Sequence, residues 1–105
     1  MTDQQQTLTA TQVREAGIDD WRQILGRIKA RFRTGDFATG LALVNKIGEA
    51  AEAANYYLDV TLSDTDVIVA LSSRDVHGIT RQEVGLAQQI SGRAADLGVE
   101  ADVRA

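Results

Sequence analysis

The sequence of 105 residues predicts one α+β domain in two layers, in which three helices cover one face of a four-stranded antiparallel sheet. Three observations lead to this prediction. Apolar and basic residues alternate from Arg27 to Arg33, apolar residues recur at steps of three and four from Phe37 onward, and a capping box opens a last helix at Thr80. Strands joined by short turns are antiparallel, which gives the order α-β-β-α-β-β-α.

A short helix and a β-hairpin are expected first. Thr9 or Thr11 can cap the helix through its side-chain oxygen. Gly26 then marks a bulge or the turn of a hairpin that joins residues 21–25 to residues 27–33. The second of these strands, RIKARFR, has one apolar face and one basic face, as expected for a strand with a buried and a wet side.

An amphipathic helix capped by Asp36 links this hairpin to a second one. Its predicted buried stripe consists of Phe37, Leu41, Val44, Ile47, Ala51 and Ala54. The stretch LDVTLSDTDVIVALSS then predicts a hairpin that turns at SDTD. The continuous apolar run from Val67 to Leu71 is typical of a central strand that is covered on both faces or meets a partner subunit.

The last helix begins at the capping box, in which the Thr80 hydroxyl meets the N3 amide and Glu83 returns to the cap amide. Ile79 and Val84 occupy the positions of a hydrophobic staple, and Gly98 ends the helix. The predicted buried stripe is Val84, Ala87, Ile90, Ala94 and Leu97.

Composition restricts the class of protein. We expect the domain over residues 9–99, between a disordered tail of residues 1–8 and a C-terminal tail of residues 100–105. No export signal or membrane-length apolar stretch is visible, so a cytoplasmic protein without membrane contact is expected. The absence of cysteine and the single histidine exclude thiolate and histidine-rich metal sites, and neither a metal nor a cofactor is expected.

The net charge of −4 argues against nucleic-acid binding by bulk charge, and nucleic acid is not an expected partner. One segment is nevertheless strongly basic and lacks acidic residues; it contains Arg22, Arg27, Lys29, Arg31 and Arg33. A wet sheet face or a protected sheet edge explains such a strand. The alternative is a surface for an anionic ligand or partner.

Several motifs resemble the pterin-4a-carbinolamine dehydratase family over about residues 8–97. Trp21 is similar to the tryptophan after the family's first helix, and FRTGDFATGLAL to its strand end and second helix. VIVALSSRDV and HGITRQEVGLA are similar to its last strand and Gly-Leu-Thr motif, with Glu83 where an aspartate is usual. The resemblance implies the fold given above, assembly into a homodimer or homotetramer, and removal of water from a 4a-hydroxytetrahydropterin.

The resemblance also implies where catalytic histidines would lie, and this sequence has other residues there. Counted back from the Gly-Ile-Thr of the last motif, the family's two adjacent histidines and proline fall on Tyr56, Tyr57 and Leu58. A third histidine falls on Arg74. The single histidine of this chain, His77, fills none of these places.

Tyrosine and arginine can bind a ligand but carry protons poorly at neutral pH. Dehydration of a carbinolamine requires an acid for the leaving hydroxyl and a base for the ring N–H. A tyrosine with a pKa of ~10 begins about 5 kcal/mol behind a histidine as a base, and arginine releases no proton. Arginine can still stabilise an anion or lower the pKa of a nearby tyrosine. Adjacent side chains of an extended segment point to opposite sides. Tyr56 lies on the same side as the apolar Leu58 and Val60, so Tyr57 is expected to face the ligand pocket on the other side.

The candidate site therefore comprises Tyr56, Tyr57 and Arg74 as ligand-binding residues, and Tyr57, Arg74, Asp75 and His77 as candidate catalytic residues. Each has a plainer explanation. The tyrosines could fill a dead pocket, Arg74 and Asp75 could form a surface ion pair, and His77 could be a solvated loop residue that has not taken over proton transfer. Glu83 is explained by its capping role, with catalysis as the alternative.

Three functions are compatible with these residues. The first is a divergent family member that has lost histidine-based dehydration and binds or transforms another small cyclic or pterin-like ligand. The second is a non-catalytic interaction or assembly protein that uses the fold as an oligomeric scaffold. The third is a slow pterin dehydratase. Enzymatic activity stays open; an enzyme here would be a lyase of the dehydratase type or a repurposed small-molecule enzyme.

Overall fold

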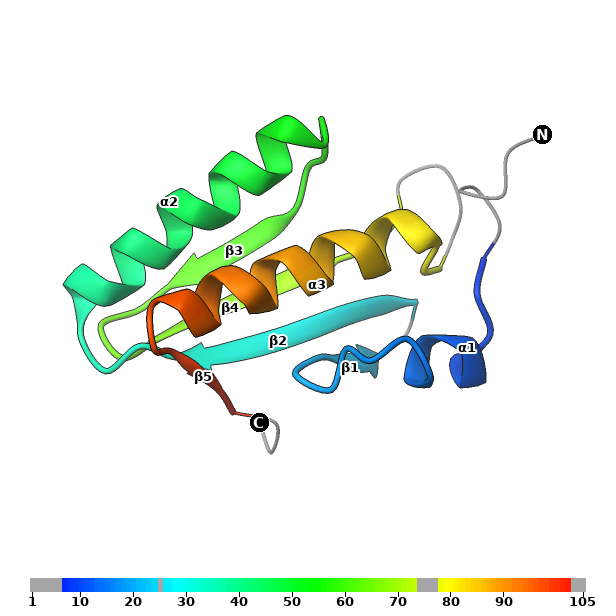
Figure 1. Ribbon diagram of the computed structural model, residues 1–105, viewed down its shortest axis with the longest axis horizontal. Helices are drawn as coiled ribbons and strands as arrows, with labels where there is room; N and C mark the ends of the chain where they lie inside the picture. Colours follow the sequence, from blue (N-terminus) through cyan, green and yellow to red (C-terminus); the bar gives the residue numbers. More distant parts are fainter. Residues whose placement is uncertain (1–6, 25, 74–77, 103–105) are drawn as a thin grey trace.

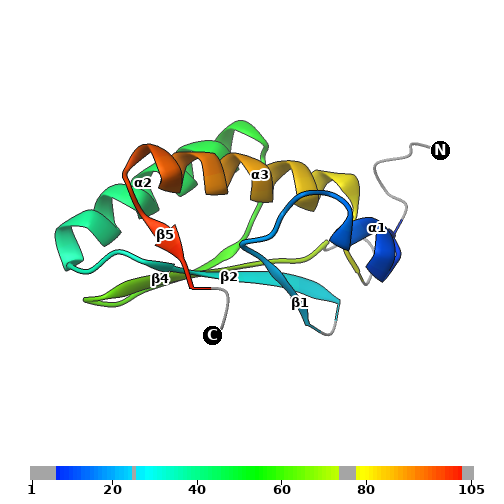
Figure 2. The same cartoon turned by 60° about the horizontal axis from the view of Figure 1, so that its bottom comes forward.

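A computed structural model describes residues 7–24, 26–73 and 78–102, and it has the two predicted layers. Helices cover one face of an antiparallel sheet, and the opposite face carries no helix among the described residues (Figures 1 and 2). The elements are α1 (Ala10–Arg14), β1 (Arg22–Ile24), β2 (Arg27–Arg33), α2 (Phe37–Ala53), β3 (Asp59–Leu62), β4 (Asp66–Leu71), α3 (Arg81–Asp96) and β5 (Glu100–Ala101).

The sheet has the order β1-β2-β4-β3, and all of its strand pairs are antiparallel. Both predicted hairpins are confirmed, because β1 pairs with β2 and β3 pairs with β4. The apolar strand β4 lies between β2 and β3, as its continuous hydrophobic run predicts. The turn between β3 and β4 is closed by a hydrogen bond from the Ser63 amide to the Asp66 carbonyl (2.9 Å).

A fifth strand was not predicted. Glu100 and Ala101 pair with Arg33 and Phe32 of β2, although the sequence had suggested a tail there. Gly98, at φ +72°, turns the chain back toward the sheet, and the adjacent Val99 is buried. Two paired residues are too few to produce a recognisable alternation, so no sequence pattern indicated this strand.

The core lies between the sheet and the helices. Along β2, Ile28, Ala30 and Phe32 are buried, whereas the intervening basic residues are exposed. The Phe32 ring meets Trp21 edge-on, with ring centroids 6.1 Å apart. The Trp21 indole N–H donates to the Ser91 hydroxyl at 3.0 Å. Trp21 thereby ties the segment before β1 to α3.

The buried face of α2 differs from the predicted stripe. The helix buries Gly40, Leu43, Ile47, Ala50 and Ala51. Two members of the predicted stripe, Phe37 and Leu41, are 53% and 46% exposed. The helix carries two adjacent apolar stripes, and three-and-four spacing alone does not decide which one faces the sheet. Gly40 decides it, because a β-carbon there would lie only 2.6 Å from Leu62 Cδ1.

The two other helices follow their sequence signals. Thr9, rather than Thr11, caps α1, and it forms a capping box with Gln12. Thr80 and Glu83 form the predicted capping box of α3, whose stripe of Val84, Ala87, Ile90 and Ala94 is buried. No helix in the described part of the chain is both long and apolar enough to cross a bilayer.

Candidate functional site

The two adjacent tyrosines lie where the chain leaves α2 for β3. Asn55 makes this turn possible, because its backbone adopts the left-handed conformation (φ +53°) that asparagine tolerates better than most residues. The Tyr56 amide then donates to the Ala51 carbonyl at 2.9 Å and closes the end of the helix. The turn therefore fixes the backbone that presents both aromatic side chains.

Tyr56 connects this junction to the end of β4. Its hydroxyl donates to the Ser72 carbonyl at 2.5 Å, while its half-buried ring packs against the core. Leu58 and Val60 follow at every second position, on the same side of the chain as Tyr56, and are half-buried against the same core. Two segments that are far apart in the sequence, after α2 and after β4, are thereby held side by side.

Tyr57 points the other way, and 70% of its surface is exposed. Its neighbours Tyr56 and Leu58 are half-buried, so the chain alternates here as an extended segment does. The expectation that Tyr57 faces a ligand stays a prediction. The geometry provides an exposed phenol ring whose backbone is fixed on both sides.

The segment that carries the remaining candidates begins beside Tyr56. The Ser73 amide donates to the Gly78 carbonyl at 3.2 Å, and the Leu8 amide donates to the Ile79 carbonyl at 2.7 Å. The candidate residues Arg74, Asp75 and His77 lie between Ser73 and Gly78, outside the described residues. The roles suggested for these three residues therefore stay predictions.

A fully buried carboxylate, Glu83, follows on the next element. Its Oε1 accepts from the Thr80 amide (2.7 Å) and from the Thr80 hydroxyl (2.5 Å). Its Oε2 has no hydrogen-bond partner among the described residues. The positive end of the α3 dipole and the two Thr80 donors account for an acidic group at this position. The structure thus gives Glu83 the capping role that the sequence predicts.

The described residues contain no cluster of side chains that could bind a metal ion. No group of three or more acidic or histidine side chains lies close enough together there to hold an ion. Beside the tyrosines, the Ser72 carbonyl accepts the hydrogen bond from the Tyr56 hydroxyl.

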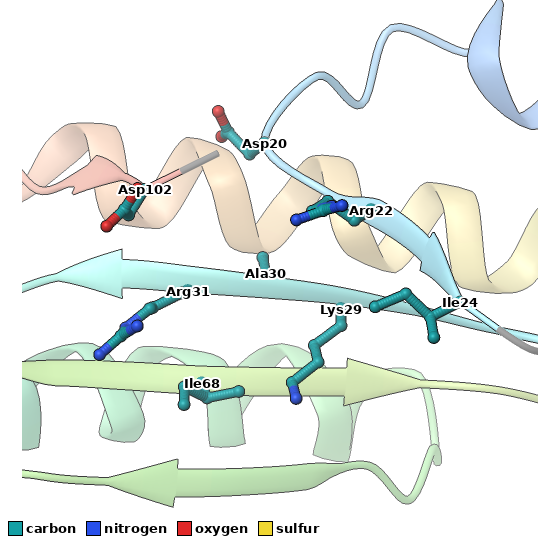
Figure 3. Close-up of a pocket in the computed structure, with 8 residues that line it drawn as sticks. All are labelled: Asp20, Arg22, Ile24, Lys29, Ala30, Arg31, Ile68 and Asp102. Carbon is teal, nitrogen blue, oxygen red and sulfur yellow. The ribbon is translucent and has the colours of Figure 1, made fainter. Parts of the chain in front are cut away.

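The structure also has hollows that sequence analysis did not locate. One of them, with a volume of about 330 Å³, lies on the open face of the sheet and includes Arg22, Lys29 and Arg31 in its lining (Figure 3). Neither Tyr56 nor Tyr57 is among its lining residues. The basic alternation along the sequence indicated the charge of this face. It could not indicate the hollow, whose lining joins residues from β1, β2 and β4 with Asp102, the residue after the unpredicted strand β5.

Comparison with known proteins shows what this chain is similar to. A family model described as pterin 4 alpha carbinolamine dehydratase matches residues 3–92. A protein of Thermosynechococcus vestitus, named provisionally as a pterin-4-alpha-carbinolamine dehydratase, is 35% identical over 79 residues. That alignment covers 75% of this chain and 83% of the relative. A protein of the same provisional name from a Picosynechococcus species is 32% identical over 81 residues, covering 77% and 88% of the two chains.

A solved structure has the same fold. The crystal structure of a transcriptional coactivator/pterin dehydratase from Brucella melitensis superimposes with a TM-score of 0.79. The superposition covers 85% of this chain and 99% of the other at 22% identity. At that identity the likeness establishes the arrangement of helices and strands and leaves the chemistry of the site to its residues.

Proposed function

Because this chain belongs to the pterin-4a-carbinolamine dehydratase family, we propose that it binds a small cyclic, pterin-like ligand beside its tyrosine pair. In this proposal the chain has lost the family's histidine-based dehydration. Tyr57 provides a stacking surface, and Tyr56 holds that surface in place. Arg74 and Asp75 complete the site by contacting polar groups of the ligand.

The observation that carries the proposal is an exposed phenol ring on a fixed support. Tyr57 exposes 70% of its surface, while its neighbour Tyr56 is tied to Ser72 by a hydrogen bond of 2.5 Å. A large exposed aromatic side chain next to such an anchored residue offers a face on which a planar heterocycle can stack. Stacking of a heterocyclic base on an aromatic side chain contributes about 1–3 kcal/mol, which suits a ring system such as a pterin.

The loss of dehydration follows from the side chains available. The whole chain contains one histidine, so a reaction that uses several histidines as acids and bases has no equivalent set of groups. Replacing a histidine base by a tyrosine raises the barrier by about 5 kcal/mol at neutral pH. That difference corresponds to a rate lower by roughly three to four orders of magnitude.

Pterin binding tests the proposal directly. We expect oxidised pterin, followed by its own fluorescence anisotropy, to bind the wild-type protein and to bind Tyr57→Ala at least about tenfold more weakly. Tyr57→Phe keeps the ring and should retain most of the affinity. Phe37→Ala removes another exposed aromatic ring, on α2, and serves as the matched control with unchanged affinity.

Two results would contradict the proposal. One is equal pterin affinity in the wild-type and Tyr57→Ala proteins, provided that both retain the same circular dichroism spectrum. The other is an equal loss of affinity in Phe37→Ala, which would indicate a nonspecific effect of exposed rings. Replacement of Arg74 by alanine then separates ligand contact from stacking, since it should weaken binding while Tyr57 is still present.

A second candidate function, assembly, is supported by the exposed stripe of α2. Phe37 and Leu41 lie one turn apart and are 53% and 46% exposed, and the next turn carries Val44, which is half-buried against the core. A contiguous apolar helix face of this kind suits a contact with another protein, including a second copy of this chain. Sedimentation equilibrium tests it: the wild-type protein should form a homodimer or homotetramer, and Phe37→Ser with Leu41→Ser should shift it toward monomer. An unchanged mass in the double variant would remove this support.

A further inference from the structure

The open face of the sheet contains a hollow that results from the way β2 is flanked. β1 pairs with the first part of β2, and β5 pairs with its last two residues, so a gap remains between β1 and β5. A hollow of about 330 Å³ lies at this gap (Figure 3). Its lining residues are Asp20, Arg22, Ile24, Lys29, Ala30, Arg31, Ile68 and Asp102.

Protection of a sheet edge does not explain the basic residues of β2. β2 has neighbours on both sides, with β4 on one side and β1 and β5 on the other. Arg22 and Lys29 are direct cross-strand partners in the antiparallel register and share the open face. The register therefore places two basic side chains next to each other on the open face, where one anionic group can contact both.

The three cations of the hollow are not equivalent. Arg31 is already neutralised, because its guanidinium contacts the Asp66 carboxylate at 2.7 Å. Lys29 has no ion-pair partner within the described residues, and its side chain extends over the sheet toward β4 (Figure 3). The two acidic lining residues lie on the side of β1 and β5, away from the Lys29 ammonium (Figure 3). Lys29 is thus the positive charge available to a ligand.

Apolar groups lie beside these charges. Ile24 is 41% exposed, and Ile68 of β4 is half-buried on the same face. Their side chains lie on either side of the Lys29 side chain in the lining of the hollow (Figure 3). A ligand that fits this arrangement has an apolar body and one anionic group.

We propose that this hollow binds a small organic anion, whose carboxylate or phosphate group contacts Lys29 and Arg22 and whose apolar body lies over Ile24 and Ile68. The volume of about 330 Å³ is near the lower end of ligand sites, which range from about 300 to 1,000 Å³, and suits a ligand of one or two rings. The site is separate from the tyrosine pair and does not depend on pterin binding.

The chain offers a matched control, because its only two lysines are Lys29 and Lys46. Lys46 belongs to α2, which covers the opposite face of the sheet. Phenyl phosphate and benzoate serve as probes, with neutral benzamide as the uncharged analogue. Binding is measured from amide shifts in two-dimensional ¹H–¹⁵N spectra at low salt, for the wild-type protein and for Lys29→Gln and Lys46→Gln.

The proposal predicts that at least one of the two anions shifts the amides of Arg22, Lys29 and Ile68, and that benzamide does not. The ratio of the affinities for phenyl phosphate and benzoate distinguishes a phosphate ligand from a carboxylate ligand. Lys29→Gln should weaken anion binding about tenfold or more, and Lys46→Gln should leave it unchanged. Equal binding of benzamide, equal effects of the two lysine substitutions, or amide shifts confined to other parts of the molecule would overturn the proposal. Lys29 is exposed, so its replacement does not unfold the domain.

Discussion

The capping box of α3 allows the most detailed prediction, because the same motif occurs twice in this chain in different surroundings. At α3, Thr80 is 2% exposed and Glu83 is fully buried. The Thr80 hydroxyl donates to Glu83 Oε1 at 2.5 Å and accepts from the Gln82 amide at 3.3 Å. Replacing Thr80 by alanine removes both interactions and leaves the buried carboxylate with one donor fewer.

The size of the effect follows from these contacts. Loss of a threonine N-cap costs about 1 kcal/mol, and loss of a buried hydrogen bond to a charged group costs about 1.5–3 kcal/mol. We therefore expect Thr80→Ala to lower the free energy of unfolding by roughly 2–4 kcal/mol. For a domain of about this size, such a change lowers the melting temperature by at least about 8 °C.

Urea and thermal unfolding, followed by circular dichroism, measure this difference. Thr80→Ser retains the hydroxyl and should recover more than half of the lost stability. Thr9→Ala removes the equivalent cap from α1, where Thr9 and Gln12 are exposed and bonded at 2.8 and 3.1 Å. That control should cost less than about 1 kcal/mol. If Thr9→Ala and Thr80→Ala destabilise equally, or if serine at position 80 is no better than alanine, the reasoning from burial is wrong.

Two further predictions concern α2. The backbone amide of Thr39 donates to the Asp36 carboxylate at 2.7 Å and lowers the pKa of that carboxyl below its usual 3.8. The stabilisation is therefore complete above pH 3.8 and is lost as pH falls through the lowered pKa. Between about pH 5 and about pH 2, Asp36→Asn should consequently lose less stability than the wild-type protein. Equal losses in the urea midpoints of the two proteins would contradict this. Gly48→Ala should stabilise the protein by about 0.5–1 kcal/mol, because the added β-carbon would have no neighbouring atom within 4 Å. Gly40→Ala should not stabilise it, because its β-carbon would lie 2.6 Å from Leu62. Equal urea midpoints for the two variants would exclude the close packing of α2 on β3.

Local signals in the sequence were enough to predict most of the fold. The Thr80 and Glu83 pair marks a helix start by its own hydrogen bonds, and strict alternation along β2 marks a strand through its pleat. The buried side of α2 could not be chosen in this way. It depends on Gly40 approaching Leu62, which is a contact between segments distant in the sequence.

The candidate site was less predictable than the fold. The parity argument for Tyr56 agrees with its half-buried position, because alternation is a local property of an extended chain. Its hydrogen bond to Ser72 depends on how β3 lies beside β4 and left no signal in the sequence. The hollow at Lys29 was equally hidden, because its lining combines residues from β1, β2 and β4 with Asp102, which follows β5.

Turnover of 4a-hydroxytetrahydropterin is the measurement that bears most directly on the proposed function. The reaction is followed by absorbance with the wild-type protein at a concentration that saturates pterin binding. We predict that the rate stays near that of the uncatalysed reaction and is unaffected by Tyr57→Phe. Turnover at the rate of relatives that use histidines would contradict the account, since it would mean that this chain carries an effective acid and base that its single histidine and its tyrosine pair do not provide.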